Sequence, residues 1–446
     1  MTGWEDERLL AGVATIDFTP GGGVAMSGFG ARTQLATAAH DPLTARAVAV
    51  SAGPVASVVV VADLVALTVS QADRLRADIA RRTGLPPSAV VVAVTHTHAG
   101  PHVTPDGLGP GCDPAVAARV ESAVAEAAEL AWMSRRPARW GHGRGEEHTV
   151  AHNRRDPAGP VDPEVTVVRI DTDAGDPLAV LFSYSCHPVV LGAGNLLFSA
   201  DWPGYARRAV EESVPGATAI FLQGCCGQVN TGHSAHASMD LSAAAGRTFE
   251  AAERLGRRVG DVAASVADGI ETSAAARVGA VTTQLPLTHA ALPTPGELAA
   301  LVSDGERELA EDPSVDRAVV LRARTTWAQR AVEGDLPRAP TVAVTALAWG
   351  ALDVVTLPGE PFVGFSSEIR AGAAGRDVLV LGYANGVPGY LPYPPAEYDA
   401  GGYEVEEAHF FYGQAQCFAP ACGPLLVETA LSALSSLPPQ PVPDRP

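Results

Sequence analysis

Short, continuously apolar runs alternate along this chain with helical segments and with turns rich in glycine and proline. Five of the runs are predicted to be strands, at 57–62, 89–94, 165–170, 179–184 and 378–381. Their residues are mostly β-branched and do not alternate with polar ones. This pattern is typical of strands that are covered on both faces.

Segments rich in Ala, Arg and Glu predict helices at 70–82, 114–131, 204–212 and 243–267. A charged helical pair at 295–309 and 314–332 is predicted to pack on the outside. The order of the elements indicates an α/β protein with a mixed β-sheet core flanked by helices. No Ser/Gly/Pro-rich linker divides the middle, so we expect one domain over 1–437 and a Pro-rich tail at 438–446.

Composition narrows the classes of function. The chain has 446 residues, of which 47% are apolar, enough for a large core. It has 31 basic and 50 acidic residues, and the net charge of −19 opposes binding to nucleic acid or anionic lipid. All the basic residues are arginine. The lack of lysine excludes Schiff-base enzymes, P-loop enzymes and metal bridges built on carbamylated lysine.

The sequence shows no targeting signal and no cysteine pattern that points to a particular class of site. The first eight residues are acidic and lack the basic-then-apolar order of a secretion signal, and no apolar run reaches the roughly 20 residues of a membrane span. The six cysteines match neither a disulfide framework nor a zinc ribbon. We expect a cytoplasmic protein with no stable membrane insertion and no nucleic-acid partner.

The strongest local signal is Thr95-His96-Thr97-His98, which directly follows a predicted strand and precedes Ala99-Gly100-Pro101. In an extended chain, side chains two positions apart point to the same side, so His96 and His98 are expected to converge. Two convergent imidazoles at a strand end suit a metal ion with an outer hydrogen-bond partner. The alternative is a pair of hydrogen-bonded core histidines.

Other candidate groups also follow apolar runs. His187 closes one run, but a single histidine there is more often a satisfied buried residue than a ligand. Asp201 either caps a helix or supports a neighbouring ligand. Glu360 lies on a turn after a strand, and Tyr398 and Tyr403 lie in the Gly/Pro-rich region that follows, where tyrosines either form a pocket wall or simply pack.

Together these motifs resemble the neutral ceramidases, the neutral/alkaline non-lysosomal ceramidases and their shorter bacterial relatives. The shared motifs occur in the family's order: Ile16-Asp17-Phe18-Thr19-Pro20, Thr95 to Pro101, His187-Pro188, Ser199-Ala200-Asp201, Phe221-Leu222-Gln223-Gly224, Pro358-Gly359-Glu360 and Asn385 to Tyr403. They extend over nearly the whole chain. The resemblance implies the fold of the neutral ceramidase catalytic domain and the activity of a mononuclear zinc amidase.

The resemblance also implies roles for individual residues. Zinc would be held by His96, His187, Glu360 and Tyr390. Catalytic roles would fall to His98, Arg154, Tyr390 and Tyr403. Zinc lowers the pKa of a bound water to about 7, and the resulting hydroxide attacks the amide carbonyl. The oxyanion would be stabilised by His98, Tyr390 or Tyr403. Arg154 would anchor a polar or anionic part of the substrate, although Arg154-Arg155 also fits a solvated turn.

Three departures from the family pattern bear on the substrate. Gly227 is followed by Gln228 where ceramidases have aspartate. We also expect neither a C-terminal immunoglobulin-like domain nor a secretion signal. We therefore expect a substrate other than extracellular ceramide, such as a soluble N-acyl compound or a specialised metabolite.

Three hypotheses follow. The first is a zinc-dependent hydrolase that cleaves a linear C–N amide bond of a small N-acyl compound. The second uses the same metal site for ester or lactone cleavage, acyl transfer or cyclisation, and product mass separates it from the first because hydrolysis adds water. The third is a catalytically inactive homologue that binds a ligand.

Overall fold

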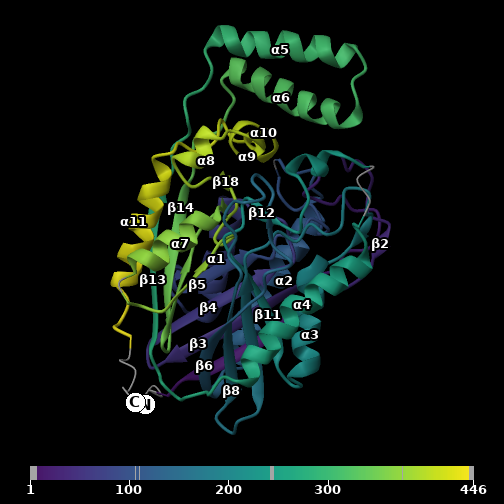
Figure 1. Cartoon of the computed structure of the whole chain (residues 1–446). Helices are drawn as coiled ribbons and strands as arrows, with labels where there is room; N and C mark the ends of the chain where they lie inside the picture. Colours follow the sequence, from purple (N-terminus) through teal and green to yellow (C-terminus); the bar gives the residue numbers. More distant parts are fainter. Residues whose placement is uncertain (1–7, 106, 110, 242–245, 374, 441–446) are drawn as a thin grey trace.

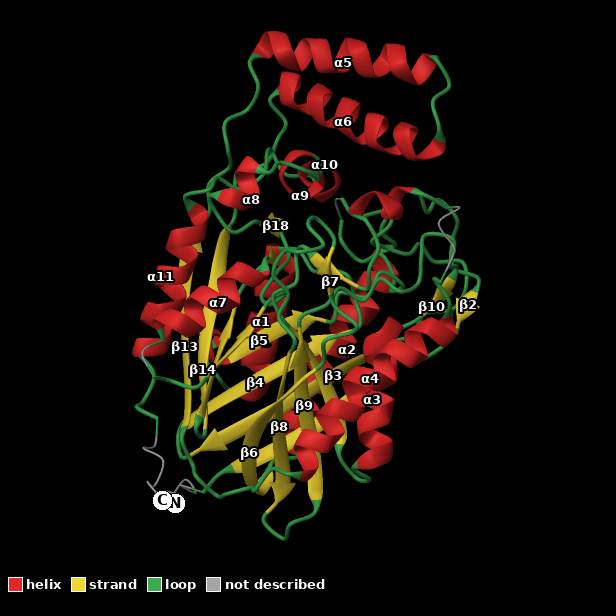
Figure 2. Ribbon diagram, in the orientation of Figure 1, coloured by secondary structure: helices red, strands yellow, loops and turns green. Residues whose placement is uncertain are grey.

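The apolar runs form two β-sheets that stack face to face, with helices on both outer faces (Figure 1, Figure 2). The structure is a computed structural model that describes residues 8–105, 107–109, 111–241, 246–373 and 375–440. The predicted mixed sheet with flanking helices is confirmed. The arrangement has four layers, in the order helices, large sheet, small sheet and helices.

The large sheet contains eight strands, whose order across the sheet differs from their order along the chain. Across the sheet they are β11 (Thr218–Gln223), β9 (Pro177–Tyr184), β8 (Glu164–Thr172), β6 (Arg136–Glu146), β1 (Leu10–Asp17), β3 (Thr44–Ala52), β4 (Val55–Ala62) and β5 (Val90–Val94). The pairs β4–β5 and β11–β9 are parallel and the other neighbours are antiparallel. The sheet is therefore mixed.

The small sheet lies against one face of the large one. Its strands are β13 (Val278–Pro286), β14 (Thr341–Trp349), β15 (Leu352–Thr356) and β17 (Val378–Leu381). In β4, Val58 and Val60 belong to the core beneath the helices, whereas Val59 and Val61 belong to the core between the sheets. Both faces of β4 are buried, which is why its sequence is continuously apolar.

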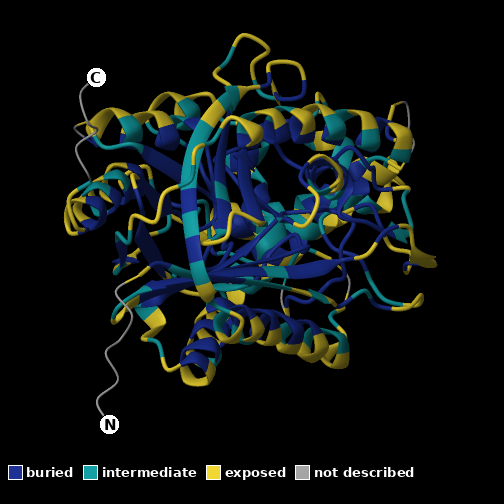
Figure 3. Cartoon of the chain, turned by 90° about the horizontal axis from the view of Figure 1, so that it is seen from below, coloured by how far each residue is buried: buried dark blue, intermediate teal, exposed yellow. Residues whose placement is uncertain are grey.

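Helices cover the two outer faces. The large sheet is covered by α1 (Val69–Thr83), α2 (Pro114–Met133), α3 (Asp201–Ser213) and α4 (Phe249–Asp268), and the small sheet by α7 (Val363–Gly372) and α11 (Cys422–Ser435). Figure 3 shows their outer sides exposed and the sheets buried. Helix α4 begins after Thr248, whose side chain accepts a hydrogen bond from the Ala251 amide, rather than at position 243. Positions 243–245 lie outside the described residues.

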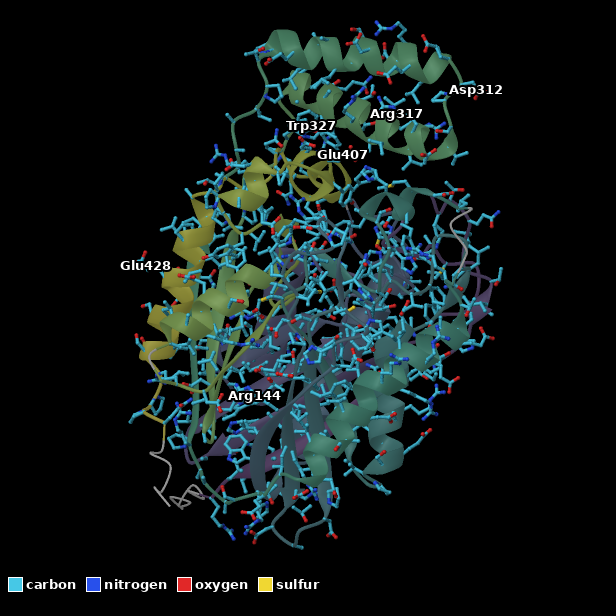
Figure 4. All side chains as sticks on the ribbon, viewed as in Figure 1. Arg144, Asp312, Arg317, Trp327, Glu407 and Glu428 are labelled. Carbon is cyan, nitrogen blue, oxygen red and sulfur yellow. The ribbon has the colours of Figure 1, made fainter. Side chains whose placement is uncertain are left out.

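A helical hairpin made of α5 (Pro295–Ala310) and α6 (Val315–Glu333) stands at one end of the molecule, so its predicted outer position is confirmed (Figure 1). Trp327 of α6, labelled in Figure 4, contacts the rings of His409 and Phe410 below it. The short helices under the hairpin are α8 (Ala396–Asp399), α9 (Tyr403–Glu406) and α10 (Ala408–Tyr412). None of the helices in the described ranges is long and apolar enough to cross a membrane.

Short elements complete the loops between the main strands and helices. They are the 3-10 turns η1 (Pro87–Ala89) and η2 (Ala235–Met239) and three two-strand pairs: β2 (Ala38–Ala39) with β10 (Leu197–Phe198), β7 (His152–Asn153) with β12 (Val229–Asn230), and β16 (Glu360–Pro361) with β18 (Tyr390–Leu391). The last pair places Glu360 directly opposite Tyr390.

Candidate metal centre

The candidate centre lies where both sheets end. His96 follows β5 and His187 follows β9, so both come from the large sheet, whereas Glu360 follows β15 of the small sheet. His96 has a φ of +67°, and Tyr383 and Asn385 in the neighbouring loop have φ values of +56° and +55°. Left-handed backbone is costly for such residues and often marks a site whose geometry the surroundings impose.

The end of β5 is fixed by a buried ion pair. The Thr95 hydroxyl donates to Asp63 Oδ1 at 3.2 Å, and the two terminal nitrogens of Arg207 each donate to one oxygen of Asp63 at 2.9 Å. Arg207 and Asp63 are both buried. This pair holds the residue immediately before His96.

Each of the three histidines donates one ring hydrogen bond to a backbone carbonyl. The Nδ1 atoms lie 2.6 Å from the Val65 oxygen for His96, 2.9 Å from the Gly28 oxygen for His98, and 2.8 Å from the Cys226 oxygen for His187. A carbonyl only accepts, so Nδ1 carries the proton. In the neutral ring, Nε2 is then a lone pair that is free to bind a cation.

These Nε2 atoms converge with a carboxylate. His96 Nε2 lies 3.3 Å from His98 Nε2 and 3.3 Å from Glu360 Oε2, and His187 Nε2 lies 2.7 Å from the same Glu360 oxygen. Lone pairs that face one another in a dry interior need a positive charge between them. Any two ligands about 2.0–2.1 Å from one ion in a tetrahedron are about 3.3 Å apart, so the spacing of His96 Nε2 and Glu360 Oε2 fits a shared divalent cation.

Protonation favours the same conclusion. Burial, together with the neighbouring His96 and His187, holds the pKa of His98 well below its usual value, and burial lowers the pKa of His187 to about 4. Burial alone would raise the pKa of Glu360, but His96 and His187 hold it well below its usual range. A neutral imidazole and an ionised carboxylate are the forms in which these side chains bind metal.

Two tyrosines that we did not predict complete the surroundings of Glu360. The Tyr412 hydroxyl donates to Oε1, and the Tyr383 hydroxyl lies 3.4 Å from Oε2. The Tyr383 ring also lies 4.5 Å from that of His96. Tyr412 comes from α10, far from Glu360 in sequence, and only the concentration of tyrosines near the C-terminus hinted at it.

Tyr390 and Arg154 lie beside this group and contact each other. The Tyr390 ring stacks on His187 at 6.4 Å, and its hydroxyl accepts a hydrogen bond from Arg154 at 3.0 Å. Arg154 also donates to Glu404 at 2.8 Å, and its side chain is only 5% exposed, so it is not part of a solvated turn. Tyr403 is one ring further out, 6.0 Å from Tyr390. Arg154 thus orients Tyr390, with its charge paired inside the protein.

Asp201 and Gln228 support the loops and do not contact the histidine rings. The buried Asp201 carboxylate accepts from the Leu191 amide at 2.9 Å and from the Trp202 amide at 2.6 Å, so it holds the loop after His187 and the start of its own helix. Gln228 Oε1 accepts from the Val363 amide at 3.1 Å. It thereby connects the loop that carries Arg154 to the start of α7.

Comparison with known proteins follows the geometry. No protein-family model matches the sequence, and no curated protein matches it. Among solved structures, the chain resembles neutral ceramidase from Pseudomonas aeruginosa, with a TM-score of 0.72 and 20% identity over 99% of this chain and 77% of that one. The chain has the neutral ceramidase fold. A ceramidase complexed with C2 is similar at a TM-score of 0.71 and 18% identity, over 98% of this chain and 77% of that one. The fold implied by the sequence motifs is thus confirmed.

Within this ceramidase fold, Gly28 provides a test of the placement of His98. A Cβ added at Gly28 would lie 2.6 Å from His98 Nδ1, and its φ is +99°. Gly28→Ala is therefore expected to displace the His98 ring. Because His98 Nε2 lies 3.3 Å from His96 Nε2, this should weaken the binding of a divalent cation about 10–100-fold, measured by competition with a chromophoric chelator. The matched control is Gly23→Ala, since Gly23 has a φ of +87° and no atom within 4 Å of an added Cβ. Equal affinity in the two variants would remove His98 from the centre.

Proposed function

We propose that the protein is a zinc-dependent hydrolase that cleaves the amide bond of a small N-acyl compound. The observation that carries this proposal is the convergence of three histidines, whose ligand atoms lie within 4.8 Å of one another, beside the Glu360 carboxylate, which contacts His96 and His187. The shared fold supports it, because the structural neighbours are ceramidases by name and the bond that a ceramidase cleaves is an amide.

In this proposal zinc would be held by His96, His187 and Glu360, together with Tyr390, which stacks on His187. A bound zinc ion acts as a Lewis acid and lowers the pKa of a water molecule. His98 is held by Gly28 through Nδ1, and its Nε2 takes the proton from the attacking water and passes it to the leaving nitrogen. The hydroxyl of Tyr403 donates to the carbonyl oxygen as negative charge develops there.

Arg154 acts through Tyr390. Its guanidinium donates to the Tyr390 hydroxyl and to the Gly227 carbonyl at 2.9 Å, while Glu404 neutralises its charge. This fixes the tyrosine oxygen beside the histidine group before a substrate arrives. Hydroxyl groups held in this way need no reorganisation during the reaction.

The test combines metal analysis with the mass of the product. We expect about one zinc per chain, loss of amide hydrolysis after chelation, and recovery when zinc is added back. A product heavier than the substrate by one water, divided between acid and amine, indicates hydrolysis. An unchanged total mass indicates acyl transfer or cyclisation with the same residues. Full turnover after complete removal of metal would contradict the proposal.

A further inference from the structure

Two cavities of similar size are lined by residues next to the metal centre, and their walls differ in charge. The first, called the apolar cavity below, has a volume of about 400 Å³. Half of its lining residues are aliphatic, namely Val69, Leu108, Pro337, Pro340, Val387 and Pro388, and the others carry hydroxyl or amide groups or, in one case, a guanidinium. The charged cavity has a volume of about 410 Å³, and its walls include Arg154, Arg155, Asp156, His236, Glu397 and Glu404. Both volumes are near the lower end of the range for small-molecule sites.

The apolar cavity shares its walls with the segments that hold the metal ligands. Tyr412, which donates to Glu360, forms one wall. Val387 and Pro388 belong to the loop whose Gly389 carbonyl accepts from the Glu360 amide at 2.9 Å. The cavity therefore begins one side chain away from the carboxylate.

Leu108 connects the same cavity to His98. Its carbonyl accepts from the Gly28 amide at 3.1 Å, and the Gly28 carbonyl in turn accepts from His98. The one charged residue in the lining of this cavity is Arg338, which is exposed. An aliphatic chain placed here loses contact with water without separating any buried ion pair.

The charged cavity adjoins the centre through two of its lining residues, Arg154 and Tyr403, which both lie next to Tyr390. Arg155 donates to Glu404 at 2.7 Å and to Glu397 at 3.0 Å, and no Val, Leu, Ile, Met or Phe is among the described residues that line the cavity. A long alkyl chain here would strip water from Asp156, Arg155 and Glu397, which are exposed or half-buried, without replacing their hydrogen bonds, which is unfavourable. A polar group can bond to them.

We infer that the substrate lies across the centre with its acyl chain in the apolar cavity and its amine-derived part in the charged cavity. This inference rests on the proposed function and names its substrate class: a single-chain N-acyl compound whose amine part is polar. Hydrolysis adds OH to the carbonyl carbon and H to the nitrogen. The carboxylate product is then left with its chain in the apolar cavity, and the amine leaves through the charged one.

The first experiment compares two amides that share an acyl chain. N-octanoylethanolamine has a small polar amine part, whereas N-octanoylsphingosine has a second alkyl chain. We expect kcat/KM to be at least about tenfold higher for the ethanolamide, because the charged cavity cannot bury the second chain. Equal or better cleavage of the sphingosine amide would overturn the inference while leaving the amide hydrolase in place.

The second experiment assigns each cavity with a substitution. Val69→Phe narrows the apolar cavity and is expected to shift the preferred acyl length of an ethanolamide series to shorter chains, whereas Val69→Ala shifts it to longer ones. Ala235→Phe, in the charged cavity, should change the preference among amines and leave the acyl-length profile as it is. Leu425→Phe on the outer side of α11 is the neutral control, since Leu425 is 47% exposed. If Ala235→Phe changes the preferred acyl length and neither Val69 variant does, the assignment of the two cavities is reversed.

A third measurement does not depend on turnover. Calorimetry with zinc-loaded protein and saturated carboxylates from butanoate to dodecanoate should show affinity rising about fourfold per added methylene until the cavity is filled. In Val69→Phe the rise should stop at a shorter chain. If no amide is cleaved but this series behaves as described, the proposed function fails and the acyl cavity stands. Affinity that is independent of chain length would overturn the acyl cavity itself.

Discussion

Replacing Glu360 with glutamine is expected to lower kcat/KM for amide hydrolysis by about 10³-fold or more, and to weaken zinc binding on the order of 10²-fold. The Glu360 carboxylate brings a negative charge to the imidazoles, because its Oε2 lies 2.7 Å from His187 Nε2 and 3.3 Å from His96 Nε2. Glutamine preserves the size of the side chain and can still accept from Tyr412. The loss of turnover and of zinc affinity would therefore come from removal of the negative charge and not from a change in packing.

The control for this variant is Glu428→Gln. Glu428 is exposed on α11 and points away from the body of the protein in Figure 4, so its loss of charge should leave both kcat/KM and zinc content unchanged. Zinc content is read by mass spectrometry of the metal and turnover by release of the amine. A Glu360→Gln protein with wild-type zinc affinity and turnover would show that Glu360 is not a ligand.

The second large effect is on stability. Arg207→Met is expected to lower the free energy of unfolding by about 3–5 kcal/mol, because it leaves the buried Asp63 carboxylate without its counter-charge. Asp63 also accepts from the Thr44 amide at 2.8 Å and from Thr95, so its charge cannot move to water without breaking the end of β5. Urea unfolding followed by fluorescence measures the loss.

Two further variants test whether the loss of stability comes from the unpaired Asp63 charge or from the change of side chain at position 207. The double variant Asp63→Asn/Arg207→Met should be more stable than Arg207→Met alone, since it removes the isolated charge. Arg257→Met breaks an ion pair with Glu212 whose side chains are 41% and 52% exposed, and it should cost less than about 1 kcal/mol. Similar losses in Arg207→Met and Arg257→Met would refute the role assigned to Asp63.

Burial on both faces decided which strands could be predicted. The five predicted runs correspond to β4, β5, β8, β9 and β17. Strand β6 was not predicted, because its sequence contains three glycines and three arginines and its side chains are mostly half-exposed. Strand β14 is apolar, but it is rich in alanine, which has a low preference for strands. Its position is set by pairing with β13 and β15, and the sequence of the strand itself does not predict that pairing.

Some residues of the candidate site could likewise be predicted from the local sequence, and others could not. His96, His187 and Glu360 could be found because each follows an apolar run and belongs to a motif. The convergence of His96 and His98 was expected from an extended chain, but the strand ends at Val94 and His96 turns into the left-handed region. The contacts of Tyr412 and Gly28 depend on loops that meet only in the folded protein, so no local pattern could predict them.

The origin of the ligands in two different sheets has a mechanical consequence. An ion held by His96 and His187 on one side and by Glu360 on the other acts as a clamp between the first and the second half of the chain. Whatever binds there more tightly in the folded than in the unfolded state stabilises the stacking itself. Binding of a metal at the centre would thus be coupled to the packing of one sheet on the other, and a substitution deep in the interface between the sheets would change metal affinity without contacting a ligand.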